Sequence, residues 1–162
     1  HESKTTRNVL ARIPEGSDYR PDPKSRTAQE IAWQIVCEEK MIVEALESGK
    51  VEWKPAPAPA TMTDVVANYE AQSAELAARS VADVVPVRVV DSRSVTLGVG
   101  TIVLACARLA ASVGALKFAA LAMPLAWSFL FDIVHHRGQI TTYLRPMGST
   151  VPQIYGPSAD EP

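Results

Sequence analysis

The sequence has no excess of charge of either sign. Its 162 residues include 16 Lys and Arg and 18 Asp and Glu, a net charge of −2, and acidic and basic residues are mixed along the chain. Proteins that bind nucleic acid need a basic surface that neutralises phosphate groups. The absence of a basic patch therefore argues against nucleic acid as a partner.

Cysteine is scarce, and a secretory leader is not visible. Cys37 and Cys106 lie in apolar surroundings without CxxC spacing, so both are expected to be small buried hydrophobic residues rather than parts of a disulfide framework. This use of cysteine is typical of a reducing compartment. The first residues, HESKTTRNVLARIPEG, contain no apolar h-region of a signal peptide. We therefore expect a cytoplasmic protein.

A hydrophobic run long enough to cross a membrane is also missing. Between residues 94 and 131 the only charges are Arg108 and Lys117. The uncharged pieces on either side are shorter than the ~20 apolar residues that a spanning helix needs, and Pro124 interrupts the second one. We expect these residues to form a soluble core, with a membrane or partner-binding hairpin as the alternative.

Apolar residues make up 47% of the sequence, enough to build the core of one domain over residues 1–162. Strand patterns are confined to residues 84–100, which predict one or two short strands or an extended loop. The last helix is expected to begin just after Pro124 and to end near residue 144, before a coil tail over residues 146–162. Helical spacing of apolar residues predicts further helices over these ranges: 3–13, 27–50, 61–82 and 101–122. The fold class expected is all-α, a four-helix bundle with long irregular connections.

Two short patterns support these boundaries. Thr27 and Glu30 have the spacing of a capping box at a helix start. The segment WKPAPAPAT, residues 53–61, predicts an extended linker because proline lacks a backbone donor and restricts the residue before it.

The candidate chemistry lies in the segment LFDIVHHRGQITTYL, residues 130–144. A carboxylate and an imidazole four residues apart can chelate one divalent ion, and they can equally form a hydrogen-bonded ion pair. His135 is rotated by about 100° and belongs to another face. The polar side chains that share one helical face are Asp132, His136, Gln139 and Tyr143. The sequence leaves a metal site and an ion pair open.

Other polar residues are weaker candidates for a functional site than Asp132 and His136. Gln34, on the helix predicted over 27–50, is either a third ligand or a hydrogen-bonded core amide, and an amide oxygen is the weaker type of ligand. Cys37 is expected to pack in the core, because no cationic cluster lies near it to lower its pKa. Arg137 either anchors the tail carboxylates Asp160 or Glu161 or is solvated. No Ser-His-Asp order, glycine-rich phosphate loop or paired-carboxylate motif is visible, so no catalytic residue follows.

Two blocks of the sequence carry a family resemblance. DYRPDPKSRTAQEIAWQIVCEEK at 18–40 and HHRGQITTYLRPMGSTVPQIYGPSADEP at 135–162 look like the DinB-like superfamily, named for a damage-inducible protein. The resemblance implies a metal-binding four-helix bundle, commonly dimeric and related to mycothiol-dependent maleylpyruvate isomerase and bacillithiol transferases. Residues 84–121 do not resemble that family, since this connection is longer and more apolar.

The resemblance also implies a ligand set. The family holds its metal with a His on the second helix and an HxxxH motif on the last one, and these positions fall on Gln34, Asp132 and His136. Only His136 keeps the family residue. The implied cofactor is zinc or nickel, and the implied function is a metal-dependent hydrolase or a thiol-dependent transferase. Its partners would be a small-molecule or low-molecular-weight thiol substrate and a second copy in a homodimer. The alternative is a metal-free, degenerate member that acts as a dimeric binding or structural module.

Overall fold

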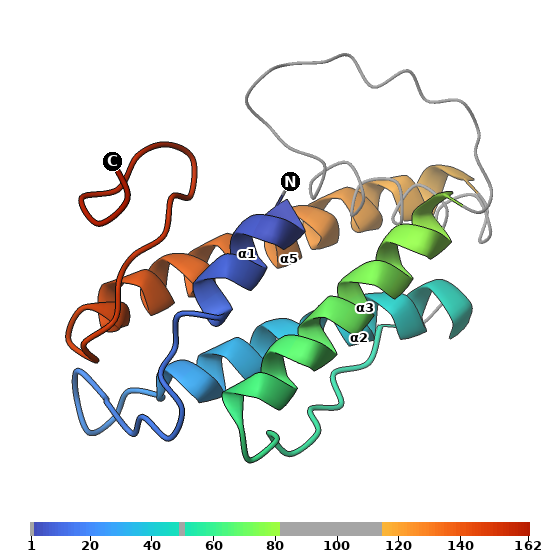
Figure 1. Cartoon of the computed structure of the whole chain (residues 1–162). Helices are drawn as coiled ribbons and strands as arrows, with labels where there is room; N and C mark the ends of the chain where they lie inside the picture. Colours follow the sequence, from blue (N-terminus) through green and yellow to red (C-terminus); the bar gives the residue numbers. More distant parts are fainter. Residues whose placement is uncertain (1, 49–50, 82–114) are drawn as a thin grey trace.

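Four helices pack side by side in the computed structural model, which describes residues 2–48, 51–81 and 115–162 (Figure 1). Helix α2 packs against α3 and α5, and the short α1 packs against α3 and α5. The helices are α1 (Glu2–Leu10), α2 (Ala28–Ser48), α3 (Met62–Val81) and α5 (Ala115–Leu144). Within the described residues there is no strand, so the predicted all-α four-helix bundle is confirmed.

Helix α5 is longer than the sequence predicted. We expected the last helix to begin just after Pro124, and this was wrong, because the helix begins at Ala115 and continues through Pro124. A proline inside a helix removes one backbone hydrogen bond, but the flanking sequence, ALKFAALAM before it and LAW after it, is rich in strong helix formers. The helix predicted over 101–122 is confirmed from residue 115 onward. Residues 101–114 and the strands predicted over 84–100 lie outside the described residues.

The start of α2 is set by its cap. The Thr27 amide donates a hydrogen bond to Glu30 Oε2 (2.7 Å), and the Glu30 amide donates to Thr27 Oγ1 (3.2 Å), which confirms the predicted capping box. The extended linker then returns along α2, since Trp33 Nε1 donates to the Ala56 carbonyl at 2.7 Å. The cap thus sets the first residue of α2, and the Trp33 contact holds the linker against this helix.

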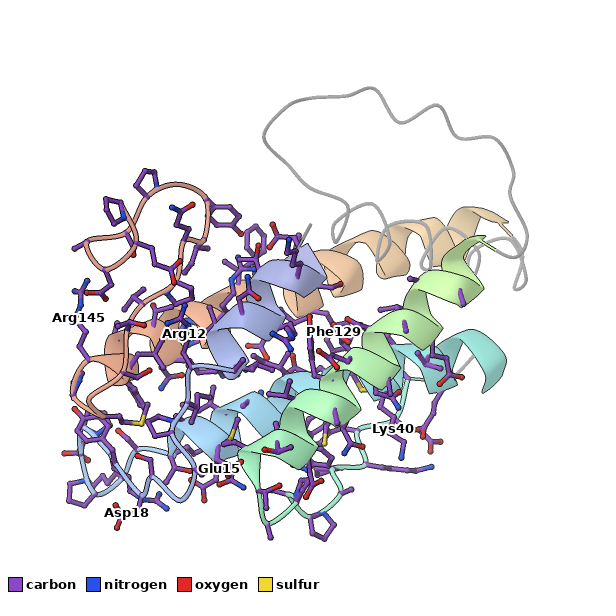
Figure 2. The ribbon with its side chains drawn as sticks, in the orientation of Figure 1. Arg12, Glu15, Asp18, Lys40, Phe129 and Arg145 are labelled. Atoms are coloured by element: carbon purple, nitrogen blue, oxygen red, sulfur yellow. The ribbon has the colours of Figure 1, made fainter. Side chains whose placement is uncertain are left out.

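A side chain from the connection between α1 and α2 caps α3. The Glu15 carboxylate accepts hydrogen bonds from the amides of Met62 (2.7 Å) and Thr63 (2.8 Å), and Figure 2 shows Glu15 beside the first turn of this helix. These backbone hydrogen bonds hold the pKa of Glu15 below its usual value. The first turn of a helix has backbone amides without partners inside the helix, and it carries a partial positive charge. An ionised acid accepts hydrogen bonds from these amides and is attracted by the charge.

The core consists of two apolar clusters, and polar residues lie between them. Along α2 and α5, Glu38 and His136 occupy positions between the residues of the first cluster and those of the second. The larger cluster includes Val9, Leu10, Ile31, Ile35, Val65, Tyr69, Ile140 and Leu144. The smaller one contains Ile42, Val43, Leu76 and Leu130. Along α2 and α5, these two polar residues, Glu38 and His136, therefore have one apolar cluster on each side.

The position of Arg137 corrects the sequence analysis. We expected this residue at Asp160 or Glu161 or in solvent, but it is 1% exposed, and its Nη1 lies 2.5 Å from Glu2 Oε2. Arg137 is buried because it lies on the face of α5 that α1 covers. The tail reaches Arg137 through Tyr155 instead, whose ring centroid lies 5.0 Å from the guanidinium carbon.

The tail carboxylates pair with other arginines. Arg145 Nε lies 3.1 Å from Asp160 Oδ2, and Arg12 pairs with Glu161. Figure 2 shows Arg12 beside α1 and Arg145 at the far end of α5, so the tail is attached at two separated points. Residues 145–148 form a turn, and residues 149–162 contain neither helix nor strand.

The described residues contain no helix long and apolar enough to cross a membrane. Most of the apolar stretch for which a hairpin was considered, residues 94–114, lies outside the part of the chain that the structure describes.

Candidate metal centre

Helices α2 and α5 bring two acids and one histidine together. One carboxylate oxygen each from Glu38 and Asp132 and a ring nitrogen of His136 all lie within 4.8 Å of one another. His136 Nε2 is 3.4 Å from Asp132 Oδ2. Glu38 and His136 are 3% and 5% exposed, whereas the Asp132 side chain is 41% exposed. The group therefore has a buried floor and one side open to solvent, and it could hold a metal ion.

The polar face predicted on the last helix forms a continuous chain of contacts. Beyond the contact with Asp132, His136 Nδ1 lies 3.3 Å from Gln139 Oε1, and Gln139 Nε2 donates to Tyr143 Oη at 3.0 Å. Because Gln139 uses its amide nitrogen on Tyr143, its oxygen faces Nδ1 and fits the tautomer of His136 that carries its proton there. This arrangement leaves the lone pair of Nε2 facing the two acids, as a metal ligand requires.

Gln34 reaches the site with the donor end of its amide. Its Nε2 donates to Glu38 Oε1 (2.8 Å) and to Asp132 Oδ2 (3.2 Å), while its Oε1 accepts a hydrogen bond from Arg26. All three sequence-derived candidates, Gln34, Asp132 and His136, are thus brought together. An amide nitrogen does not ligate a metal, so in this arrangement Gln34 orients the two acids. Its role as a ligand stays a prediction.

Sequence reasoning missed Glu38, although a signal for it was present. The apolar stripe of α2 contains Ile31, Ile35 and Ile42, and Glu38 fills the position between the last two at helical spacing. An acid at a core-facing position of a helix needs a partner, because burial of an unpaired charge is costly. Its proximity to α5 depends on how the two helices pack, which one sequence does not reveal.

The electrostatics of the group favour a cation. Burial and a hydrogen bond with Asp132 raise the pKa of Glu38 to about 8. Burial also acts to raise the pKa of Asp132, but the hydrogen bond with Glu38 and the charge of His136 hold it below its usual value. Burial lowers the pKa of His136 and so favours the neutral imidazole. Within the described residues no group donates to Glu38 Oε2, a buried oxygen that fits a cation.

The two other residues weighed near the site take no part in the group. His135 is exposed, with its ring centroid 5.2 Å from that of His136. Cys37 is a buried free cysteine, as predicted, and burial raises the pKa of its thiol, the opposite of what a nucleophile needs. Cys106 lies outside the described residues.

Comparison with known proteins gives one finding about the family. The sequence model of the DinB family matches residues 131–162, the segment that contains Asp132, His136 and the tail. No curated protein and no solved structure matches the chain. The matched segment begins at the candidate ligands of α5, and the helical architecture agrees with the fold that the resemblance implies. The match supports the assignment of this chain to the DinB-like superfamily.

Proposed function

We propose that this protein binds one divalent metal ion, zinc or nickel, through Glu38, Asp132 and His136. The observation that carries the proposal is Glu38, whose carboxyl lies on the core-facing side of α2 with one oxygen that receives no hydrogen bond in the described residues. Two carboxylates balance the charge of a divalent ion, and imidazole nitrogen with carboxylate oxygen is a donor set that zinc accepts.

Three protein ligands leave a coordination position for a substrate. When bound, the ion supplies a Lewis acid that polarises a substrate or activates an oxygen or sulfur nucleophile. The residues of the chain hold the geometry: Gln34 orients Glu38 and Asp132, and Gln139 orients His136. We propose a metal-dependent hydrolase or a thiol-dependent transferase that acts on a small molecule or with a low-molecular-weight thiol, because the superfamily resemblance supports these classes.

Metal titration of untagged, metal-stripped protein tests the site. We expect one zinc or nickel ion per chain by calorimetry, with affinity lowered at least about tenfold in Glu38→Gln and in His136→Ala, since loss of even an outer partner of a metal site typically costs that much. His135→Ala is the matched control, because it removes a neighbouring imidazole outside the group. A stoichiometry well below one, or full affinity in Glu38→Gln, would contradict the proposal.

A second candidate function is a metal-free module of degenerate sequence. It is favoured by the way Gln34, Glu38 and Asp132 satisfy one another through hydrogen bonds without an ion. In that case the unmodified protein takes up no metal, and Gln34→His, which restores the family residue, raises the metal content to about one ion per chain. Metal uptake by the unmodified protein would eliminate this alternative.

The homodimer belongs to the same proposal. Val51 and Trp53 are 41% and 50% exposed on the extended segment beside α2, and a symmetric copy would cover such apolar side chains. Light scattering after size-exclusion chromatography is expected to give twice the chain mass, and a monomer mass would contradict the dimer. A cytoplasmic location and a single domain stay predictions.

A further inference from the structure

An exposed arginine stands at the open side of the candidate metal centre. Arg26 precedes the α2 cap residue Thr27 and belongs to the connection between α1 and α2. Its Nη1 donates a hydrogen bond to Gln34 Oε1. The core of the bundle does not need this contact, because Arg26 is exposed and Gln34 is half-buried.

Gln34 links this arginine to the acids. The amide donates to Glu38 Oε1 (2.8 Å) and Asp132 Oδ2 (3.2 Å), so its two ends connect the guanidinium to both carboxylates. Arg26 is also close enough for its charge to act on Glu38 and His136. The guanidinium therefore lies one amide group away from the proposed ion. Arg26 itself belongs to the connection that leads from α1 into α2.

Charge and geometry define what this edge would bind. Glu38 and Asp132 together balance one divalent ion, which leaves the charge of Arg26 uncompensated by the group. A guanidinium has five N–H donors in a planar fork that matches a carboxylate, and Gln34 accepts from one of its nitrogens. The one uncompensated charge is matched by one carboxylate, whereas a dianion such as a phosphate ester would leave a second negative charge without a partner at this edge.

We propose that Arg26 is a specificity-determining residue that binds a single carboxylate of a small ligand while the rest of that ligand faces the Glu38, Asp132 and His136 group. This inference rests on the proposed metal site, since the uncompensated charge exists only when the ion is present. Gln34 then has a second role, because it holds the guanidinium in place before the ligand arrives.

Cobalt-loaded protein and 3-mercaptopropionate provide the test, because its thiolate would face the ion while its carboxylate binds Arg26. The visible absorption of bound Co²⁺ is the readout. We expect 3-mercaptopropionate to change the spectrum of the unmodified protein, and Arg26→Gln to weaken its affinity about tenfold or more, the loss of a charged hydrogen bond. Arg26→Lys should recover part of the affinity, since it keeps the charge without the planar fork. Cobalt affinity should not fall in either variant, because Arg26 is not a ligand of the ion.

The matched control is Arg20→Gln, which removes the same charge from the same connection. Arg20 binds the Ser25 carbonyl at 2.8 Å and Glu30 at 3.4 Å, so its loss should leave the affinity for 3-mercaptopropionate as it is. Equal affinity of Arg26→Gln and the unmodified protein for 3-mercaptopropionate, or tighter binding of 2-mercaptoethylphosphonate than of 3-mercaptopropionate, would overturn this inference while the metal site stands. Failure of the unmodified protein to bind cobalt would instead overturn the proposed function.

Discussion

Replacing Arg137 with methionine is expected to lower the free energy of unfolding by about 3–5 kcal/mol, the usual result of removing one partner of a buried ion pair. Arg137 is 1% exposed and Glu2 is 8% exposed. Arg137 Nη1 lies 2.5 Å from Glu2 Oε2 and 3.3 Å from Thr6 Oγ1. Methionine fills most of the volume but leaves the Glu2 carboxylate buried without its cation. Urea denaturation of metal-free protein near neutral pH measures the change.

A double variant separates the charge from the packing. Glu2→Gln combined with Arg137→Met should recover most of the lost stability, because replacing both ions removes the uncompensated charge. The matched control is Arg145→Met, which breaks the pair with Asp160. Because the Arg145 side chain is 56% exposed, a change below about 1 kcal/mol is expected there. A similarly small change in Arg137→Met would show that this pair does not hold α1 and α5 together.

The second large effect is a loss of stability as the pH rises, caused by Glu39. This residue is 6% exposed, and one of its oxygens accepts from Ser73 Oγ at 3.1 Å. Within the described residues no group donates to the other oxygen. Burial raises the pKa of Glu39 from 4.5 to about 7. Between these two pH values the folded chain keeps a proton that the unfolded chain has lost.

The sign of the effect follows from this difference. The contribution of the protonated carboxyl is fully present below pH 4.5 and is lost as the pH rises through about 7. The total loss corresponds to roughly 3 kcal/mol. Glu39→Gln keeps the shape and removes the ionisation, so we expect its free energy of unfolding to exceed that of the unmodified protein by about 3 kcal/mol at pH 8 and by less than about 1 kcal/mol near pH 5.

Urea denaturation of both proteins at the two pH values, with a chelator present, measures this difference. Comparison between variant and parent isolates Glu39 from the neighbouring Glu38, which is the same in both proteins. Glu44→Gln on the same helix is the matched control, because Glu44 is exposed and its replacement should have the same small effect at both pH values. A Glu39→Gln variant that is destabilised equally at pH 5 and pH 8 would rule out the ionisation.

Local signals were enough for the start of α2 and its cap. Thr27 and Glu30 place the start of α2 because the capping hydrogen bonds join residues three apart. The polar face through Asp132 and His136 also followed from spacing, because helical geometry alone puts these residues together. The start predicted from Pro124 was wrong, because the helix formers on both sides of this proline outweigh the local rule for helix starts.

By itself, the sequence determined an all-α chain with a polar face on its last helix and Gln34 as a residue near that face. Only the tertiary structure decided that Glu38 completes the group with Asp132 and His136, and that Arg137 pairs with Glu2. The physical reason is the same for both. These partners come from different helices, and the packing of the apolar clusters, rather than any local pattern, sets which side chains then meet.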